Sequence, residues 1–203
     1  MHARSLGSSL AFVLALAVAG CTGDDDPEPA AVPSSPSTPL ASYATEGMVV
    51  PRGHFCQNIG EAAIEETLGG PPGGSRTYDN GDRARLTRQV TDVAHEYGCV
   101  FASADGTTAR AWVFAPPVTQ KRARGLVSGE GRGADCRVAE NAPAFGEPSV
   151  AVTCETPERT TTSFHGLFGD AWLSCSLSVS GDGDPLERAG RWCVTVADAA
   201  RLG

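Results

Sequence analysis

The sequence lacks the residues and motifs on which many enzymes and nucleic-acid-binding proteins depend. Lys121 is the only lysine, so a lysine-assisted serine nucleophile is not predicted. Neither Gly-x-Ser-x-Gly nor Ser-x-x-Lys occurs, and these are common contexts of a catalytic serine. The net charge is −8, and no basic stripe runs along the chain. Nucleic acid is therefore not an expected partner.

Recognisable metal-binding motifs are also missing. No Cys-x-x-Cys occurs, and His54, His95 and His165 form neither His-x-x-x-His nor His-Glu-x-x-His. The acidic residues of 182–184, together with Glu187, could hold calcium, but their spacing is too short for an EF-hand loop. We expect no metal and no cofactor.

The apolar run at the N-terminus, Leu10–Gly20, is too short to cross a bilayer, which needs about 20 apolar residues. Arg4 precedes the run, and no acidic residue occurs before Asp24. This pattern predicts a secretory signal over residues 1–20. Cys21 follows three small residues and resembles the lipidated cysteine of bacterial lipoproteins. An ordinary signal peptide followed by a coincidental cysteine is the alternative.

Residues 22–50 contain five prolines and no lysine or arginine. This composition is typical of disordered or extended chain, and a coil of this length spans about 30 Å. We therefore expect 21–50 to be the lipidated cysteine and a tether. All three tryptophans and the other six cysteines lie in 51–203, which suits a single domain.

The six cysteines of that domain predict a disulfide framework, because an exported protein with an even number normally pairs them. The stretch 171–180 alternates as a strand that turns Cys175 inward, next to Leu173 and Leu177. Residues 185–201 have a helical apolar stripe that contains Cys193. A helix folded back on the strand would pair these two cysteines. The remaining predicted pairs are Cys56–Cys99 and Cys136–Cys154.

The predicted fold is α+β, with a mostly antiparallel sheet, helices packed on one face and three disulfides. Turn signals separate strands near 97–102 and 108–115, and later strands near 149–155, 160–168 and 171–180. Helices are expected after Cys56, after a Thr119 cap and over 185–201. The stretch 86–95 fits either a helix or a strand.

Trp172 is the candidate binding-surface residue. It falls on the face of the 171–180 strand that carries Ser174 and Ser176, opposite Leu173. A large aromatic side chain on a solvated face indicates a contact surface. The other large aromatic side chains are expected in the core.

The whole pattern resembles the small actinobacterial envelope lipoproteins of unknown function. The matching features are Cys21 with its tether, Cys56 before a helix ending at Leu68-Gly69, Tyr97-x-Cys99, Gly169–Trp172 before Cys175, and Arg191–Cys193. The resemblance implies a lipid-anchored domain on the outer face of the cell membrane. It supplies no catalytic residues.

We therefore expect a membrane-tethered, non-catalytic domain that binds an envelope ligand or protein. A secreted hydrolase with a histidine and carboxylate site is one alternative, and a structural or inhibitory partner of another envelope protein is a second. A pocket that places a histidine beside a carboxylate would favour the hydrolase.

Overall fold

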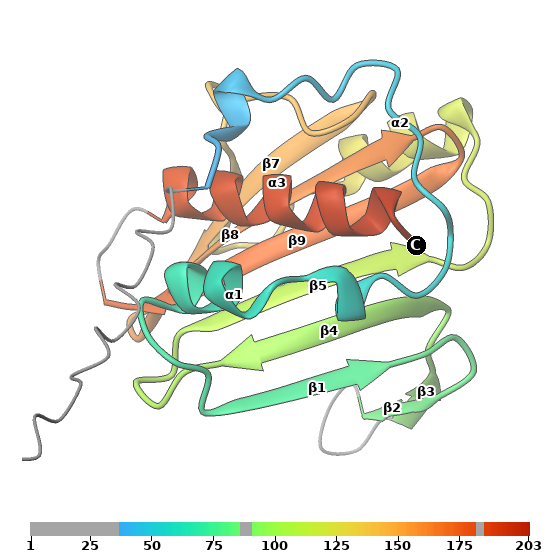
Figure 1. Ribbon diagram of the computed structural model, residues 1–203. Coiled ribbons are helices and arrows are strands. Elements are labelled where there is room, and N and C mark those ends of the chain that lie inside the picture. The colour runs from blue at the N-terminus through green and yellow to red at the C-terminus, as the bar shows by residue number, and fades with distance from the viewer. Residues whose placement is uncertain (1–36, 86–90, 182–184) are drawn as a thin grey trace, which may run out of the picture. The chain divides into compact units, whose positions relative to one another are not determined.

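A seven-stranded antiparallel sheet organises the chain (Figure 1). The computed structural model describes residues 37–85, 91–181 and 185–203. In spatial order the strands are β1 (Gly74–Tyr78), β4 (Glu96–Ala102), β5 (Thr108–Phe114), β9 (Ala171–Ser180), β8 (Arg159–Phe168), β7 (Ser149–Glu155) and β6 (Cys136–Val138). A separate two-stranded sheet pairs β2 (Arg83–Arg85) with β3 (Thr91–Val93). The helical elements are η1 (Leu40–Ser42), η2 (Cys56–Asn58), α1 (Glu61–Leu68), α2 (Gln120–Gly129) and α3 (Leu186–Arg201).

The main core lies between α3, α1 and one face of the sheet, which we call the front face. Leu173, Cys175 and Leu177 project from β9 into this core and are at most 1% exposed. The helix α3 presents Trp192 and Cys193, both fully buried. Trp192 also donates a hydrogen bond from Nε1 to the carbonyl of Arg110, at 3.0 Å. Burying each large side chain of this kind contributes about 1.5–3 kcal/mol.

The helix α2 packs on the opposite, back face of the sheet. Its buried Ala123, with Val118 before it, contacts Leu167 and Trp172 in a second, smaller apolar cluster. The predicted α+β fold with a mostly antiparallel sheet is confirmed, but not all of its helices lie on one face. Thr119 caps α2 as predicted, because its hydroxyl accepts from the Arg122 N–H at 3.2 Å.

All three predicted disulfide pairings are present. Cys56 pairs with Cys99, Cys136 with Cys154 and Cys175 with Cys193, with Cα–Cα distances of 6.0, 4.0 and 5.5 Å. The last joins α3 to β9, as the strand and helix periodicities predicted.

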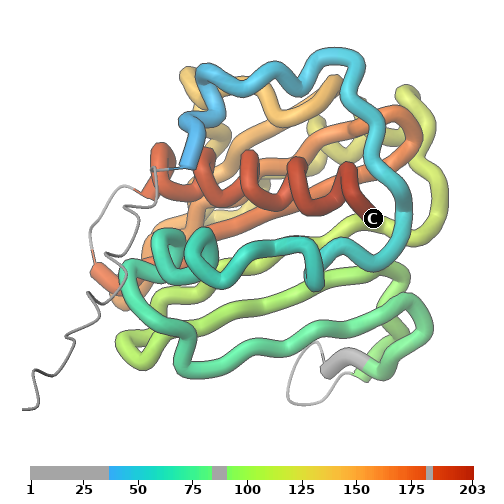
Figure 2. Tube along the Cα trace, in the orientation of Figure 1, coloured from blue at the N-terminus to red at the C-terminus, as the bar shows by residue number. Residues whose placement is uncertain are grey.

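The predicted tether is wrong for residues 37–50, which pack on the domain (blue in Figure 2). Leu40 is 4% exposed, and Val50 is 1% exposed. The Tyr43 hydroxyl donates to Asp198 of α3 at 2.6 Å, and Thr45 Oγ1 accepts from the Gly146 N–H. These contacts with residues far along the chain order a segment whose composition alone is typical of disordered chain. The signal segment, Cys21 and the rest of the predicted tether lie outside the described residues.

The structure also contains a strand that was not predicted, and it resolves part of the ambiguous segment 86–95. The strand β1 was not predicted, because a glycine-rich stretch precedes it and its side chains are mostly polar. The ambiguous 86–95 segment contains the strand β3, while 86–90 lie outside the described residues. In the described parts of the chain, no helix is long and apolar enough to cross a membrane.

Candidate functional site

Trp172 is not a surface residue. It is 1% exposed, as is Ser174, because α2 covers this part of the back face. Its ring lies parallel to the ring of His165, with centroids 6.4 Å apart. The predicted binding surface at Trp172 is therefore wrong. Alternation along a strand shows which side chains share a face, but a helix from elsewhere in the chain decides whether that face meets solvent.

His165 and Ser174 form a hydrogen-bonded pair on the back face, with 2.7 Å between Nδ1 and Oγ. Burial lowers the pKa of His165, and the nearby Glu130 carboxylate opposes that shift. Because Ser174 is 1% exposed, its hydroxyl is out of reach of a substrate. The serine holds the orientation of a largely neutral imidazole, and we assign the pair a structural role.

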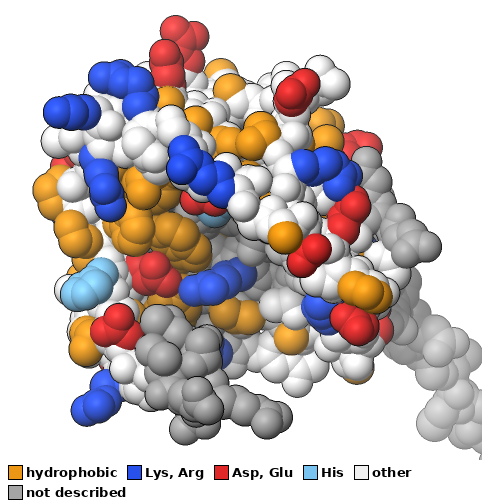
Figure 3. Space-filling model, turned by 180° about the vertical axis from the view of Figure 1, so that it is seen from behind, with side chains coloured by type: hydrophobic (Ala, Val, Ile, Leu, Met, Phe, Trp, Pro, Cys, Tyr) orange, Lys and Arg blue, Asp and Glu red, His pale blue; other side chains and the backbone are white. Residues whose placement is uncertain are grey.

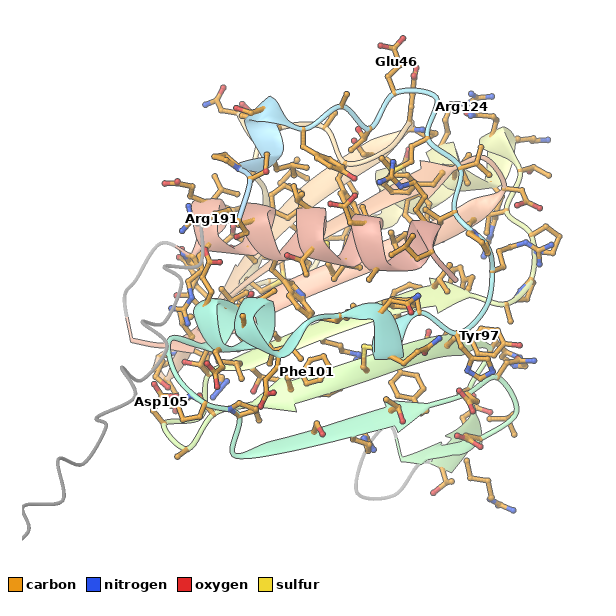
Figure 4. All side chains as sticks on the ribbon, viewed as in Figure 1. Glu46, Tyr97, Phe101, Asp105, Arg124 and Arg191 are labelled. Carbon is orange, nitrogen blue, oxygen red and sulfur yellow. A yellow bond between two sulfur atoms is a disulfide. The ribbon has the colours of Figure 1, made fainter. Side chains whose placement is uncertain are left out.

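A groove on the front face is the candidate site, because it brings a histidine, a carboxylate and aromatic side chains together. It encloses about 270 Å³ next to the edge strand β1. Its walls come from β1, β4 and the segment around η2. Figure 4 labels Tyr97 and Phe101, two aromatic side chains of β4 that line the groove. The lining residues are His54, Phe55, Cys56, Gln57, Ser75, Thr77, Tyr78, Asp79, Tyr97, Gly98 and Phe101.

The disulfide between Cys56 and Cys99 holds one wall of this groove in place. It ties η2 to β4, and the neighbouring Phe55 is 1% exposed and packs into the main core. The C-terminal residue packs against the same segment. Gly203 lies so close to His54 that a Cβ at Gly203 would be 2.6 Å from the His54 carbonyl oxygen. The wall is therefore fixed from two sides.

His54 is the titratable group at the mouth of the groove. Its Nδ1 lies 3.0 Å from an Asp79 carboxylate oxygen, and its ring meets the edge of the Tyr97 ring at a centroid distance of 4.8 Å. The side chains of His54 and Asp79 are 61% and 52% exposed. The pair is thus open to solvent and to any molecule in the groove.

The back of the same strands carries a hydrogen-bond network that fixes β1. The Tyr78 hydroxyl donates to Glu96 at 2.8 Å and accepts from Arg110 at 3.0 Å, while Arg110 and Glu96 form an ion pair at 3.2 Å. Burial raises the pKa of Tyr78 to about 12, so the hydroxyl keeps its proton. Gly98 makes room for the ring, because a Cβ there would lie 2.4 Å from the Tyr78 hydroxyl oxygen. An edge strand anchored from behind leaves its front side chains available.

The three histidines, each a candidate general base or metal ligand from the sequence, lie at three separate sites in the structure. His54 reaches the groove, His165 is on the back face and His95 is exposed near β4. Within the described ranges no three histidine, cysteine, aspartate or glutamate side chains gather as a metal site. The six cysteines are all in disulfides, which removes thiolate chemistry from the domain.

The groove was not predicted from the sequence, because β1 was not predicted. One signal was present: Ser75 and Thr77 alternate with Arg76 and Tyr78, four residues compatible with a strand. Five residues between turn signals make a weak periodic pattern. Only the pairing of Thr77 with Cys99 in the sheet shows that this strand adjoins η2 through the disulfide.

Comparisons with known proteins add little. No protein-family model and no curated protein matches this chain. One solved structure, described as a GTP binding regulator from Thermotoga maritima, covers 75% of this chain and 96% of its own, at a TM-score of 0.32 and 12% identity. A similarity this distant carries no argument about function.

Proposed function

We propose that the protein is a lipid-anchored extracytoplasmic domain that binds an extended polypeptide segment, without catalysis, in the groove beside β1. The observation that carries this proposal is an edge strand whose front side chains line a groove. In the part of the chain that the structure describes, no strand pairs with the outer side of β1. Ser75 and Thr77, two residues apart on that strand, both line the groove.

Strand addition explains how such a site would recognise a ligand. An edge strand presents unpaired backbone N–H and C=O groups, which can pair with an incoming extended chain. Alternate side chains of that chain would then enter the groove. Tyr97 and Phe101 offer apolar contacts there, and Gln57, His54 and Asp79 offer polar ones. Backbone pairing would supply affinity, and the groove would supply specificity.

The size of the groove supports a peptide side chain as its occupant. Pockets for complete drug-sized ligands and cofactors occupy about 300–1,000 Å³. The groove, at about 270 Å³, lies at the lower limit of this range and is open to solvent. It suits one or two side chains of a longer chain that continues along β1.

A test of the groove starts from a displayed library of short peptides, selected on the purified domain. For a selected peptide, Ser75→Arg should weaken binding at least tenfold, because the new side chain fills the groove. Ser180→Arg, at the exposed end of β9, is the matched control and should change the affinity by less than twofold. N-methylation of alternate backbone amides in the peptide should also abolish binding. Equal binding of the peptide to the Ser75→Arg and Ser180→Arg variants would contradict the proposal that the groove is the binding site.

The lipid anchor has a separate test. If Cys21 carries the lipid, Cys21→Ser should release the protein from the membrane fraction or leave its signal uncleaved. One acyl chain holds a protein only weakly to a membrane, whereas two hold it stably. Normal processing and full membrane retention of the variant would contradict the lipoprotein interpretation.

One observation favours the hydrolase alternative, namely the His54–Asp79 pair at the mouth of the groove. A histidine oriented by a carboxylate can act as a general base. Among the residues that the structure describes, no serine, threonine or cysteine is hydrogen-bonded to the His54 side chain, so the histidine would have to activate water. Turnover of peptide or ester substrates by the purified domain, lost in His54→Ala and kept in His95→Ala, would establish this activity in place of simple binding.

A further inference from the structure

The exposed side of α2 and the loop after it form a basic surface on an acidic protein. Residues 119–133 contain four cations, Lys121, Arg122, Arg124 and Arg132, and one carboxylate, Glu130. All four cations are exposed, and we call this surface the basic α2 face. Figure 3 shows lysine and arginine side chains on this side of the molecule, and Figure 4 shows Arg124 extending outward. The chain as a whole has a net charge of −8.

These four cations differ from Arg52, Arg110, Arg137, Arg191 and Arg201, each of which has a carboxylate partner. Arg52 pairs with Asp170, Arg110 with Glu96 and Arg191 with Glu187. Among the described residues, none of the four cations of the basic α2 face lies within 4.0 Å of a carboxylate oxygen. Their charge is therefore available to an external anion.

Half-buried apolar side chains accompany the charges. Trp112 and Phe114 on β5 lie with ring centroids 4.8 Å apart and pack beside α2. Leu126 and Val127 of α2 are also only half-buried. Figure 3 shows an apolar patch on the same side of the molecule as the cations. Tryptophan beside arginine and lysine is the combination that favours the boundary between lipid headgroups and water.

We infer that the basic α2 face docks on the anionic headgroups of the membrane surface. This partner is favoured because a basic amphipathic helix flanked by aromatic side chains suits a flat surface of negative charge. Each lysine or arginine near an anionic bilayer strengthens binding by about fivefold. The acidic remainder of the domain would be repelled, so docking would hold the domain in one orientation.

The inference rests on the lipid anchor of the proposed function only for bringing the domain close to a membrane. Fifteen residues separate Cys21 from Ser37, the first described residue. Chain of that length reaches at most about 55 Å, whereas a domain of this size has a radius of gyration of about 15 Å. The anchor therefore permits the basic α2 face to reach the bilayer.

The test uses the chain from Thr22 onward, without lipid, so that docking is measured apart from anchoring. It is mixed with vesicles of phosphatidylcholine alone, or of phosphatidylcholine and phosphatidylglycerol in equal parts, and the bound fraction is measured by sedimentation. We expect binding to the anionic vesicles only, weakening as salt is added because exposed charges are screened.

A pair of charge-reversal variants distinguishes the basic α2 face from the rest of the surface. The triple variant Lys121→Glu, Arg122→Glu, Arg124→Glu should lose binding to the anionic vesicles by at least about a hundredfold. The control reverses Arg76, Arg83 and Arg201, three exposed arginines on other elements, and should keep binding within about threefold. Thermal unfolding of both variants confirms that they fold.

Two outcomes would overturn the inference: no binding of the wild-type chain to anionic vesicles, or equal losses in the two variants, which would show a non-specific effect of net charge. Neither outcome depends on the peptide groove. Ser75→Arg should leave vesicle binding unchanged, and the α2 variant should leave peptide binding unchanged.

Discussion

The two halves of the sheet differ in how many layers cover them. In the half formed by β9 and β8, α3 packs on the front face and α2 on the back. Trp172 and Phe164 are each 1% exposed, although they point to opposite faces. In the half formed by β1 and β4, the groove opens on the front face, and β1 ends the sheet. The half with β9 and β8 contains most of the buried core, whereas the half with β1 and β4 leaves the groove exposed.

The largest expected change in the free energy of unfolding concerns the half of the sheet formed by β9 and β8. Trp172→Ala should lower the free energy of unfolding by about 3–5 kcal/mol, because it leaves a large cavity between α2 and the sheet. Trp112→Ala is the matched control on the same face and should cost clearly less, since Trp112 is half-buried. Urea unfolding of both variants measures the difference. Equal losses would mean that the back face is covered as completely over β5 as over β9.

The second prediction compares two disulfides that close loops of the same length. Both Cys175–Cys193 and Cys136–Cys154 span 18 residues, so chain entropy assigns each about 3 kcal/mol. The first pair is buried between α3 and β9, whereas the second is half-buried at the β6 edge.

Replacing both cysteines of the inner pair by alanine should therefore cost more than about 3 kcal/mol, because packing is lost as well. The same replacement of the edge pair should cost about 3 kcal/mol or less. Denaturant unfolding of the two double variants provides the comparison. A greater loss at the edge would contradict the assignment of the main core to α3 and β9.

The smallest expected effect concerns pH. Burial lowers the pKa of His165 in the folded protein, so the unfolded chain binds this proton more tightly. Stability should be complete above the ordinary histidine pKa of about 6.5 and should fall as the pH drops from there through the lowered folded value. His165→Gln should flatten this part of the stability profile, whereas His95→Gln, at an exposed site, should leave it unchanged. An unaltered profile in the His165 variant would show that another group titrates there.

The predictions made from sequence were accurate where one element carries its own pattern. The alternation in 171–180 and the stripe in 185–201 placed Cys175 and Cys193 on facing surfaces, and the helix cap at Thr119 is present. The candidate site was not predictable in the same way. It required β1, whose short polar sequence gives a weak signal, and it required the pairing of β1 with β4, which places β1 beside the predicted Cys56–Cys99 disulfide.

The sequence by itself determined the α+β composition and the facing positions of Cys175 and Cys193, because the periodicity of a strand or a helix is a local property of that element. Only the tertiary structure decided which surfaces remain open. The helix α2 covers Trp172 through Ala123, which is 49 residues away along the chain, and residues 37–50 pack on α3 despite a composition typical of a tether. Coverage depends on contacts between distant segments, and no local pattern records what will lie on top of a face.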